Sequence, residues 1–403
     1  MRTIREFFER VKSWYNLHFS SIIFFFVCVY IIASPVVRVL PFSLNRILVA
    51  VLLGLLILRF LFHELFNPIY YFAFLFLLVV FTVTSLNSGS FLLENLIDFA
   101  YFGMTVLVFV LVMDRDLQNE LPVFFKKYRP IVLIAVLLCY SLFALALLFS
   151  DSFEKDGAFR GFDVSSHSVA TVSILCAVLL VAARYKLPIW YIPAGLFIYM
   201  SKARTFLFLL VPIAFIYCLV VCKKRSIGLT LFFALILVAA VIIPFTPIGD
   251  KIRSTSSGWY RNHPIDAISN GRSLMWTDCI AAFFSGDLSH ILFGNSFSFV
   301  KTIIEADFGI RLWAHNDFIE MLLATGVFGL IAYLGFFSLS VYSIKGSPKR
   351  IALLLFFFTA ALLNGYMLYF HLSISALILS SLSLPASSAK RLQREMIITK
   401  LNI

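Results

Sequence analysis

The sequence predicts an all-α, polytopic integral membrane protein, and two observations point to this class. The chain has 403 residues, of which 61% are hydrophobic and 13% charged, whereas a soluble domain carries about 25% charged residues. Apolar runs long enough to cross a bilayer also recur along the whole chain. We therefore expect one membrane domain, residues 1–403, embedded in a lipid bilayer.

The positions of the apolar runs predict about twelve transmembrane helices. Some runs are short, notably 187–200, which indicates a tilted, broken or partly interfacial helix. No small-residue cleavage site follows the first run, so we expect a retained helix and not a signal peptide. The spans are expected at 18–37, 44–62, 69–86, 96–113, 131–150, 168–183, 187–200, 205–221, 227–246, 317–343, 351–370 and 372–386.

Basic residues gather in the connections on alternate sides of these spans. With the N-terminus inside, the cytoplasmic segments contain 20 Lys and Arg residues and the short outer loops contain 6. This asymmetry predicts that both termini are cytoplasmic. Because the net charge of +12 is distributed as a topology signal, we expect no nucleic-acid partner.

One large outer loop, residues 247–314, separates the ninth and tenth spans. A segment of this size inside a compact protein is usually functional. Within the loop, the stretch from Gly271 to Phe284 has apolar residues at helical spacing. We expect this stretch to form a helix that lies on the membrane or over a cavity.

The stretch His315–Glu320 stands where this loop re-enters an apolar helix. Asn316 is a suitable N-cap, and Asp317 suits the first helical turn. His315 would then lie just outside the positive end of the helix, which favours the neutral imidazole that accepts a proton. Glu320 is placed to orient the histidine ring or a substrate hydroxyl. From position alone, a plain helix cap at the membrane interface is an equal alternative.

Two glycines, Gly326 and Gly329, follow on one face of the same expected helix. Small residues at such positions let another helix approach closely. We therefore expect them to serve helix packing.

Basic residues on the outer side are the candidates for binding an anion. Lys202 and Arg204 occupy a short outer turn, and an anionic head group would explain why they stand there. Arg272 opens the loop helix, where a guanidinium group and free amides together suit a phosphate. Arg160 and His167 are weaker candidates of the same kind. The commoner alternatives are a snorkelling anchor for Arg204 and an exposed loop charge for Arg272.

Other kinds of chemistry find little support in the sequence. It contains no GxxxxGK[ST] loop and no HExxH or CxxC metal spacing, so we expect a site without metal or cofactor. Asp114 and Asp116 match the letters of a carboxylate pair, but we expect them in a solvated cytoplasmic turn. Arg59 and Asp98 lie close enough to span ends to act as anchors.

The spacing of His315-Asn316, nine residues, Gly326, two residues and Gly329 matches the H[NSQ]-x9-G-x-x-G signature of the bacterial O-antigen ligase and O-antigen polymerase superfamily. The chain also resembles these proteins in its expected spans, cytoplasmic termini and large periplasmic loop. Arg204 and Arg272 stand where the family keeps its two important arginines.

This resemblance implies an inverting, metal-independent glycosyltransferase of the GT-C type in the bacterial inner membrane, with a periplasmic active site. The donor would be an oligosaccharide on undecaprenyl pyrophosphate. Arg204 and Arg272 would bind the pyrophosphate, and His315 would be the general base for the acceptor hydroxyl. The residues suit these roles, since fixed cations stabilise charge on a leaving group and a neutral histidine takes a proton.

The acceptor remains open at this point. A polymerase extends another lipid-linked repeat unit, whereas a ligase transfers the glycan to lipid A–core. The residues after the histidine and the acidic and aromatic loop residues favour the polymerase, which a chain-length-determining co-polymerase often accompanies. A lipid-linked glycan transporter or flippase ranks third, because related halves and ionisable residues near mid-bilayer are not evident.

Overall fold

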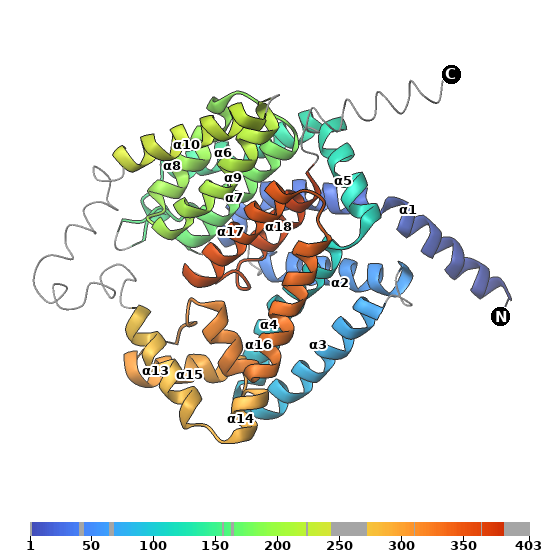
Figure 1. Cartoon of the computed structure of the whole chain (residues 1–403), viewed down its shortest axis with the longest axis vertical. Helices are drawn as coiled ribbons and strands as arrows, with labels where there is room; N and C mark the ends of the chain where they lie inside the picture. Colours follow the sequence, from blue (N-terminus) through green and yellow to red (C-terminus); the bar gives the residue numbers. More distant parts are fainter. Residues whose placement is uncertain are drawn as a thin grey trace, which may run out of the picture.

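The fold is a bundle of α-helices joined by short 3-10 turns (Figure 1). The computed structural model describes residues 2–39, 44–63, 68–154, 157–162, 165–222, 225–242, 272–309, 311–363 and 365–382. Residues 247–271 of the expected outer loop therefore lie outside the described residues. Within the described ranges, one isolated bridge between Phe153 and Phe159 is the only β-type pairing.

The helices follow one another along the chain with few long connections. The first group is α1 (Arg2–Ala33), α2 (Leu44–His63), α3 (Pro68–Asn87), α4 (Leu92–Val112), α5 (Arg115–Lys127), α6 (Arg129–Ala146), α7 (Ser166–Ala182), α8 (Ile192–Met200), α9 (Leu210–Val221) and α10 (Arg225–Ile242). The second group is α13 (Arg272–Ser285), α14 (Leu288–Phe293), α15 (Phe297–Phe308), α16 (Asp317–Ser343), α17 (Ser347–Leu363) and α18 (Phe370–Ser381). The 3-10 turns are η1 (Ser34–Val39), η2 (Gly89–Phe91), η3 (Ser150–Ser152), η4 (Pro188–Tyr191) and η5 (Arg204–Leu209).

Five helical segments of the described chain are long and apolar enough to cross a membrane. They are His18–Val36, Pro68–Asn87, Gly89–Val112, Arg129–Ala146 and Asp317–Ser343, and shorter apolar helices accompany them. This composition agrees with the predicted all-α, multi-pass membrane protein. The last segment has the bounds expected for the tenth span, while the total of twelve spans stays a prediction.

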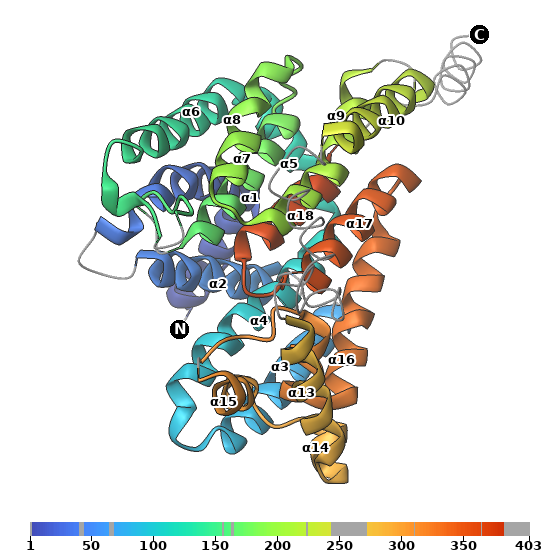
Figure 2. The same cartoon turned by 90° about the vertical axis from the view of Figure 1, so that its left-hand side faces the viewer.

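The helices from the outer loop gather at one end of the molecule. Both views place α13, α14 and α15 beside α16, at the end opposite α5, α6 and α10 (Figures 1 and 2). α15 packs on α4 and α16, and α14 packs on α16. The helix expected from Gly271 to Phe284 is present as α13, and its contacts with α15 and α16 show that it is docked on the bundle.

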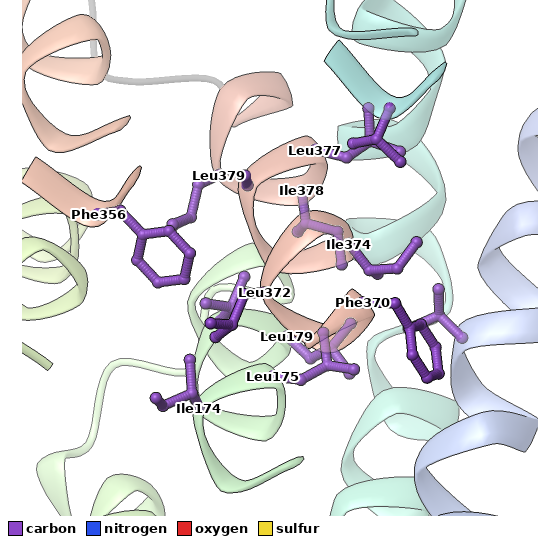
Figure 3. Packing of buried hydrophobic residues seen from close by; sticks show 14 of the residues in the cluster. Ile174, Leu175, Leu179, Phe356, Phe370, Leu372, Ile374, Leu377, Ile378 and Leu379 are labelled. Atoms are coloured by element: carbon purple, nitrogen blue, oxygen red, sulfur yellow. The ribbon is translucent and has the colours of Figure 1, made fainter. Parts of the chain in front are cut away.

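The last described helix, α18, is the centre of the bundle. All of its residues are buried, including one histidine and four serines. It packs against α7, α4, α17 and α5. Figure 3 shows Leu379 beside Phe356 of α17, and Leu372 close to Ile174 of α7.

Polar groups on α18 find partners on the surrounding helices. The ring of His371 contacts the Tyr30 hydroxyl and lies 3.3 Å from Thr171 Oγ1. Ser373 Oγ is 3.3 Å from Thr105 Oγ1, and Gln118 donates to Ser380 at 2.9 Å. Hydrogen bonds of this kind remove the cost of burying a polar group in an apolar bundle. Apolar periodicity did not predict any of these contacts, because each one joins helices far apart in the sequence.

The eleventh helix ends earlier than expected. The apolar run predicted a span over 351–370, but α17 stops at Leu363 and a turn precedes α18. Gly365 in this turn has a left-handed φ of 83°, a conformation that glycine adopts without strain. A Cβ at this position would lie 3.2 Å from Asp317 Oδ1, so glycine also allows the turn to approach that carboxylate.

The expectation of a solvated turn at Asp114 is wrong. Asp114 is 5% exposed and caps α5 by accepting from the backbone N–H groups of Asp116 and Leu117. Its second oxygen accepts from Arg59, with Nη2 at 2.7 Å. Arg59 is 2% exposed, so it is a buried partner of Asp114 and not a free anchor at a span end.

Replacement of Asp114 by alanine should destabilise the protein strongly, because it leaves the Arg59 charge buried without its partner. The loss expected for breaking a buried pair is about 3–5 kcal/mol. The measurement is the midpoint of thermal unfolding of the detergent-purified protein. The double variant Arg59→Met with Asp114→Leu should recover most of the loss, and Lys126→Ala is the exposed-charge control. An Asp114→Ala midpoint equal to that of the control would contradict the assignment.

Candidate active site

His315 occupies a strained turn directly before α16. Its φ is 55°, one of three positive values among the non-glycine residues of the described chain. The left-handed region is uncommon for residues with a side chain, and it marks positions that the surroundings hold in place. The next residue, Asn316, is the N-cap of α16 and accepts from Phe318 N and Ile319 N at 3.0 and 3.3 Å. The predicted cap is therefore confirmed, and it places the imidazole at the positive end of α16.

Both backbone groups of Ala314 are fixed, and this holds the histidine turn. The Ala314 N–H donates to Glu320 Oε2 at 3.0 Å. The Ala314 carbonyl accepts from Trp276 Nε1 of α13 at 2.7 Å. Glu320 is 2% exposed, so its carboxylate is used inside the protein to shape the turn that carries His315. The sequence suggested that Glu320 orients the ring, and this contact shows an indirect way of doing so.

Asp317 joins the histidine turn to the turn before α18. One carboxylate oxygen accepts from Tyr366 N at 2.9 Å and from Met367 N at 3.0 Å. The same oxygen lies 3.3 Å from the Tyr333 hydroxyl, which donates to it. Because Asp317 is 2% exposed, these bonds replace the water that its carboxylate would otherwise need.

Arg272, at the start of α13, reaches the same region from the outer loop. Its Nη1 donates to the carbonyl of Leu363, the last residue of α17. Burial lowers the pKa of the Arg272 guanidinium, while the nearby Tyr369 acts in the opposite direction. An arginine still remains charged at any physiological pH. No carboxylate of the described residues forms an ion pair with Arg272, so a partly desolvated cation faces this site.

Aromatic rings connect the arginine to the histidine. The ring of His167, at the start of α7, lies 6.4 Å from the ring of His315 and 6.4 Å from the ring of Tyr369. Phe206 packs edge-on against Tyr369 at 5.4 Å. All four of the residues His167, Arg272, His315 and Tyr369 keep part of their surface accessible. The sequence pointed to Arg272 and His315 but not to Tyr369, which no motif marks.

The backbone of Arg204, the second predicted pyrophosphate ligand, also lies in this region. It is the first residue of η5, which packs on α17 and α7. Phe206, two residues later, contacts both His167 and Tyr369. The side chain of Arg204 lies outside the described part of the structure. Its turn nevertheless belongs to the same group of segments as Arg272 and His315.

Arg160 and Lys202, two further basic residues predicted on the outer side, form a neighbouring group. Phe159 N donates to Met200 O at 3.0 Å, which ties the loop before α7 to the turn that contains Lys202. Arg160 donates to the Asp151 carbonyl at 3.0 Å through Nη2. Among the described contacts, none joins Arg160 to His315 or Arg272. Arg160 therefore shapes its own loop, and Lys202 stands on the adjoining turn.

The glycines of the signature contact the loop in a specific way. α16 is interrupted at Gly326, where φ is 67°. A Cβ at Gly326 would clash with the backbone of Leu292 and Phe293 at the end of α14, and Asn295 N donates to Leu323 O at 2.9 Å. The segment that approaches Gly326 closely is thus the backbone at the end of α14, in the outer loop. At Gly329, a Cβ would meet Thr325 of the same helix.

An ion-pair cluster, which the sequence analysis missed, attaches the loop to α4. Lys301 of α15 is buried and pairs with Glu94 at 2.9 Å and Asp98 at 2.8 Å, and its Nζ lies 3.7 Å from the Trp313 ring centroid. Arg311 donates to Glu94 at 3.0 Å, and this bond raises the Arg311 pKa. Asp98 is therefore paired with the loop. The signal was two carboxylates four residues apart on an apolar helix, which share a face and require cations.

The fold and this site define a multi-pass membrane protein with a histidine and a basic group brought together by a long loop. Residues 189–334 match the family model described as O-antigen ligase. This match supports an O-antigen ligase and polymerase superfamily domain in that part of the chain, and members of the family are glycosyltransferase-like enzymes that act on lipid-linked glycans. No curated protein matches the chain. The matched range includes Arg204, Arg272, His315 and both signature glycines.

Replacement of Glu320 should separate a positioning role from a chemical one. Glu320→Gln keeps a side-chain oxygen that accepts from Ala314 N, so most of the glycan-transfer activity should remain. Glu320→Ala leaves that buried N–H unsatisfied at a cost of about 1–3 kcal/mol, and activity should fall at least about tenfold. The measurement is glycan length in a complemented deletion strain, with membrane levels compared by immunoblot. Equal loss in both variants would show that the carboxylate itself is needed.

Replacement of Gly326 by alanine should detach the loop from α16, since the new methyl group meets the Leu292 and Phe293 backbone. The left-handed φ alone costs about 1–2 kcal/mol for a residue with a side chain. Gly335→Ala is the matched control on the same helix, because open space surrounds Gly335; it should stabilise by about 1 kcal/mol. Thermal unfolding of the purified protein measures both. A Gly326→Ala midpoint at or above the Gly335→Ala midpoint would refute this view of the crossing.

Proposed function

We propose that this protein transfers a glycan from undecaprenyl pyrophosphate to a sugar hydroxyl on the periplasmic side of the inner membrane. The observation that carries the proposal is the meeting of separate segments around the turn before α18. The start of α13 with Arg272, the turn with His315 and the start of η5 all reach this turn. The family match supports glycan transfer.

In this proposal His315 is the general base. The neutral imidazole takes a proton from the acceptor hydroxyl as that oxygen attacks the anomeric carbon. The bond from the anomeric carbon to the pyrophosphate oxygen breaks at the same time, with inversion at carbon. The left-handed turn at His315 and the two bonds to Ala314 hold the backbone that carries the imidazole, which is the kind of preorganisation that lowers a barrier.

Arg272 and Arg204 stabilise the leaving group. Negative charge grows on the pyrophosphate as the glycosidic bond breaks, and fixed cations in a partly dry site lower the energy of that state. Arg272 suits this role because it is partly desolvated and pairs with no carboxylate of the described residues. Lys202, on the turn that leads to Arg204, adds positive charge nearby.

The polymerase is the first candidate and the ligase the second. The ring of His167 lies against that of His315, and Tyr369 lies on the other side of His167. Both His167 and Tyr369 keep part of their surface accessible, so they suit stacking on a sugar, which either acceptor supplies. Asp317 and Glu320 are used to hold backbone groups, so the acidic residues after the histidine support the fold as well as the polymerase assignment. The family match supports the superfamily to which both candidates belong.

Replacement of His315 by alanine should abolish glycan transfer, since loss of a general base costs about 10²–10⁴-fold in rate. The measurement is the lipopolysaccharide banding of a deletion strain that carries the variant. For a polymerase, core capped by a single repeat unit should remain. For a ligase, bare core and accumulated lipid-linked polymer should appear instead.

The matched control is His290→Ala, which removes an exposed histidine on α14 of the same loop. It should give the banding of the unmodified protein. Normal banding with His315→Ala, at equal membrane levels, would reject His315 as the base.

A further inference from the structure

Tyr369 lies at the point where the basic and histidine parts of the site meet. It is the N-cap residue of α18, directly after the turn that Asp317 holds. Its ring is nearly parallel to that of His167, with 12° between the planes and 6.4 Å between the centroids. His167 in turn stacks with His315 at 6.4 Å and 28°. The three rings therefore form a row that ends at Tyr369.

Arg272 stands at the Tyr369 end of this row. Its guanidinium donates to Leu363 O, at the beginning of the turn that Tyr369 ends. The two groups also influence one another's charge: burial raises the pKa of Tyr369 to about 12, and Arg272 acts against that rise. The phenol is therefore protonated at physiological pH. An O–H donor therefore lies within electrostatic range of a partly desolvated guanidinium, and neither group carries negative charge.

We propose that Tyr369 is a substrate-binding residue of this site, donating a hydrogen bond from its hydroxyl to the anionic group that Arg272 binds. The inference rests on the proposed function, which supplies a pyrophosphate as that group. The observation that supports the proposal is the position of Tyr369 between Arg272 and the stacked rings of His167 and His315. A phenol and a guanidinium that point to one phosphate can share its oxygens, since each phosphate oxygen accepts more than one hydrogen bond.

The row of rings also fixes the distance between the proposed anion site, at Arg272 and Tyr369, and the proposed base, His315. The ring of His167 lies between the ring of Tyr369 and the ring of His315. Phe206 supports the Tyr369 ring from its edge. A substrate whose pyrophosphate is held at Tyr369 and Arg272 would thus present its sugar toward the His315 end of the row.

The test is ligand binding by the full-length protein in lipid nanodiscs. The probes are undecaprenyl pyrophosphate and undecaprenol, which share the chain and differ in the anionic group. The variant is Tyr369→Phe, which keeps the ring and removes only the hydroxyl. Tyr366→Phe is the matched control, because Tyr366 lies in the same turn with its ring packed on Phe109 and Phe357 in the core.

Tyr369→Phe should weaken undecaprenyl pyrophosphate binding by about tenfold, the value expected for one hydrogen bond to a charged group. Undecaprenol binding and the unfolding midpoint should stay unchanged, and Tyr366→Phe should bind both probes as the unmodified protein does. Arg272→Gln should also weaken the pyrophosphate probe selectively.

The outcomes separate this inference from the function on which it rests. If the unmodified protein binds undecaprenyl pyrophosphate and Tyr369→Phe binds it equally well, the role of Tyr369 is refuted and the proposed function stands. If Tyr369→Phe weakens both probes alike, the residue serves packing only and the inference fails. If the unmodified protein shows no preference for the pyrophosphate over undecaprenol, the donor assignment fails as well.

Discussion

The site depends most on the carboxylate of Asp317. One of its oxygens accepts from two successive backbone N–H groups, those of Tyr366 and Met367, and from the Tyr333 hydroxyl. Each buried N–H left without an acceptor would cost about 1–3 kcal/mol. Asp317 therefore stabilises the buried turn between α17 and α18. That turn begins after Leu363, which binds Arg272, and it ends at Tyr369, so one carboxylate connects the basic side of the site to the histidine side.

Within the stretch from His315 to Glu320, the polar residues divide into one that is accessible and three that serve the backbone. Asn316 caps α16, Asp317 holds the turn before α18, and Glu320 holds Ala314. Only His315 keeps a side chain partly accessible and a strained backbone. Residues held in sparsely populated conformations cluster at functional sites, where the surroundings must over-determine them. Here the polar neighbours of His315, through their bonds to backbone groups, hold the strained turn in place.

Local patterns predicted the parts of the structure that local physics decides. The bounds of α16 followed from hydropathy, the Asn316 cap from helix-end chemistry, and α13 from apolar spacing inside a polar loop. Arg272 reaches the end of α17 at Leu363, and His315 lies beside the His167 ring that stacks on Tyr369, while the predicted roles of Arg272 and His315 stay predictions. A capping residue or an apolar face needs only its own neighbours along the chain.

The remaining features are pairings between distant segments, which no local period contains. Arg59 with Asp114, and Lys301 with Glu94 and Asp98, satisfy charges that would otherwise be stranded in an apolar bundle. Such residues are visible in the sequence as charges inside apolar helices, but their partners are not. The same is true of Tyr369, since tyrosines are common in this chain and only three-dimensional contacts distinguish one of them.

The interruption of α16 gives the family signature a geometric meaning. Asp317 and Gly326 mark two points where other chain segments meet the same helix: the turn before α18 at the first, and the backbone after α14 at the second. Nine helical residues at 1.5 Å each separate these points by about 14 Å. The nine-residue gap between the His-Asn pair and the first glycine therefore sets the distance between the two contacts. An insertion or deletion in it would rotate one crossing point away from its partner, even if every named letter of the signature were kept.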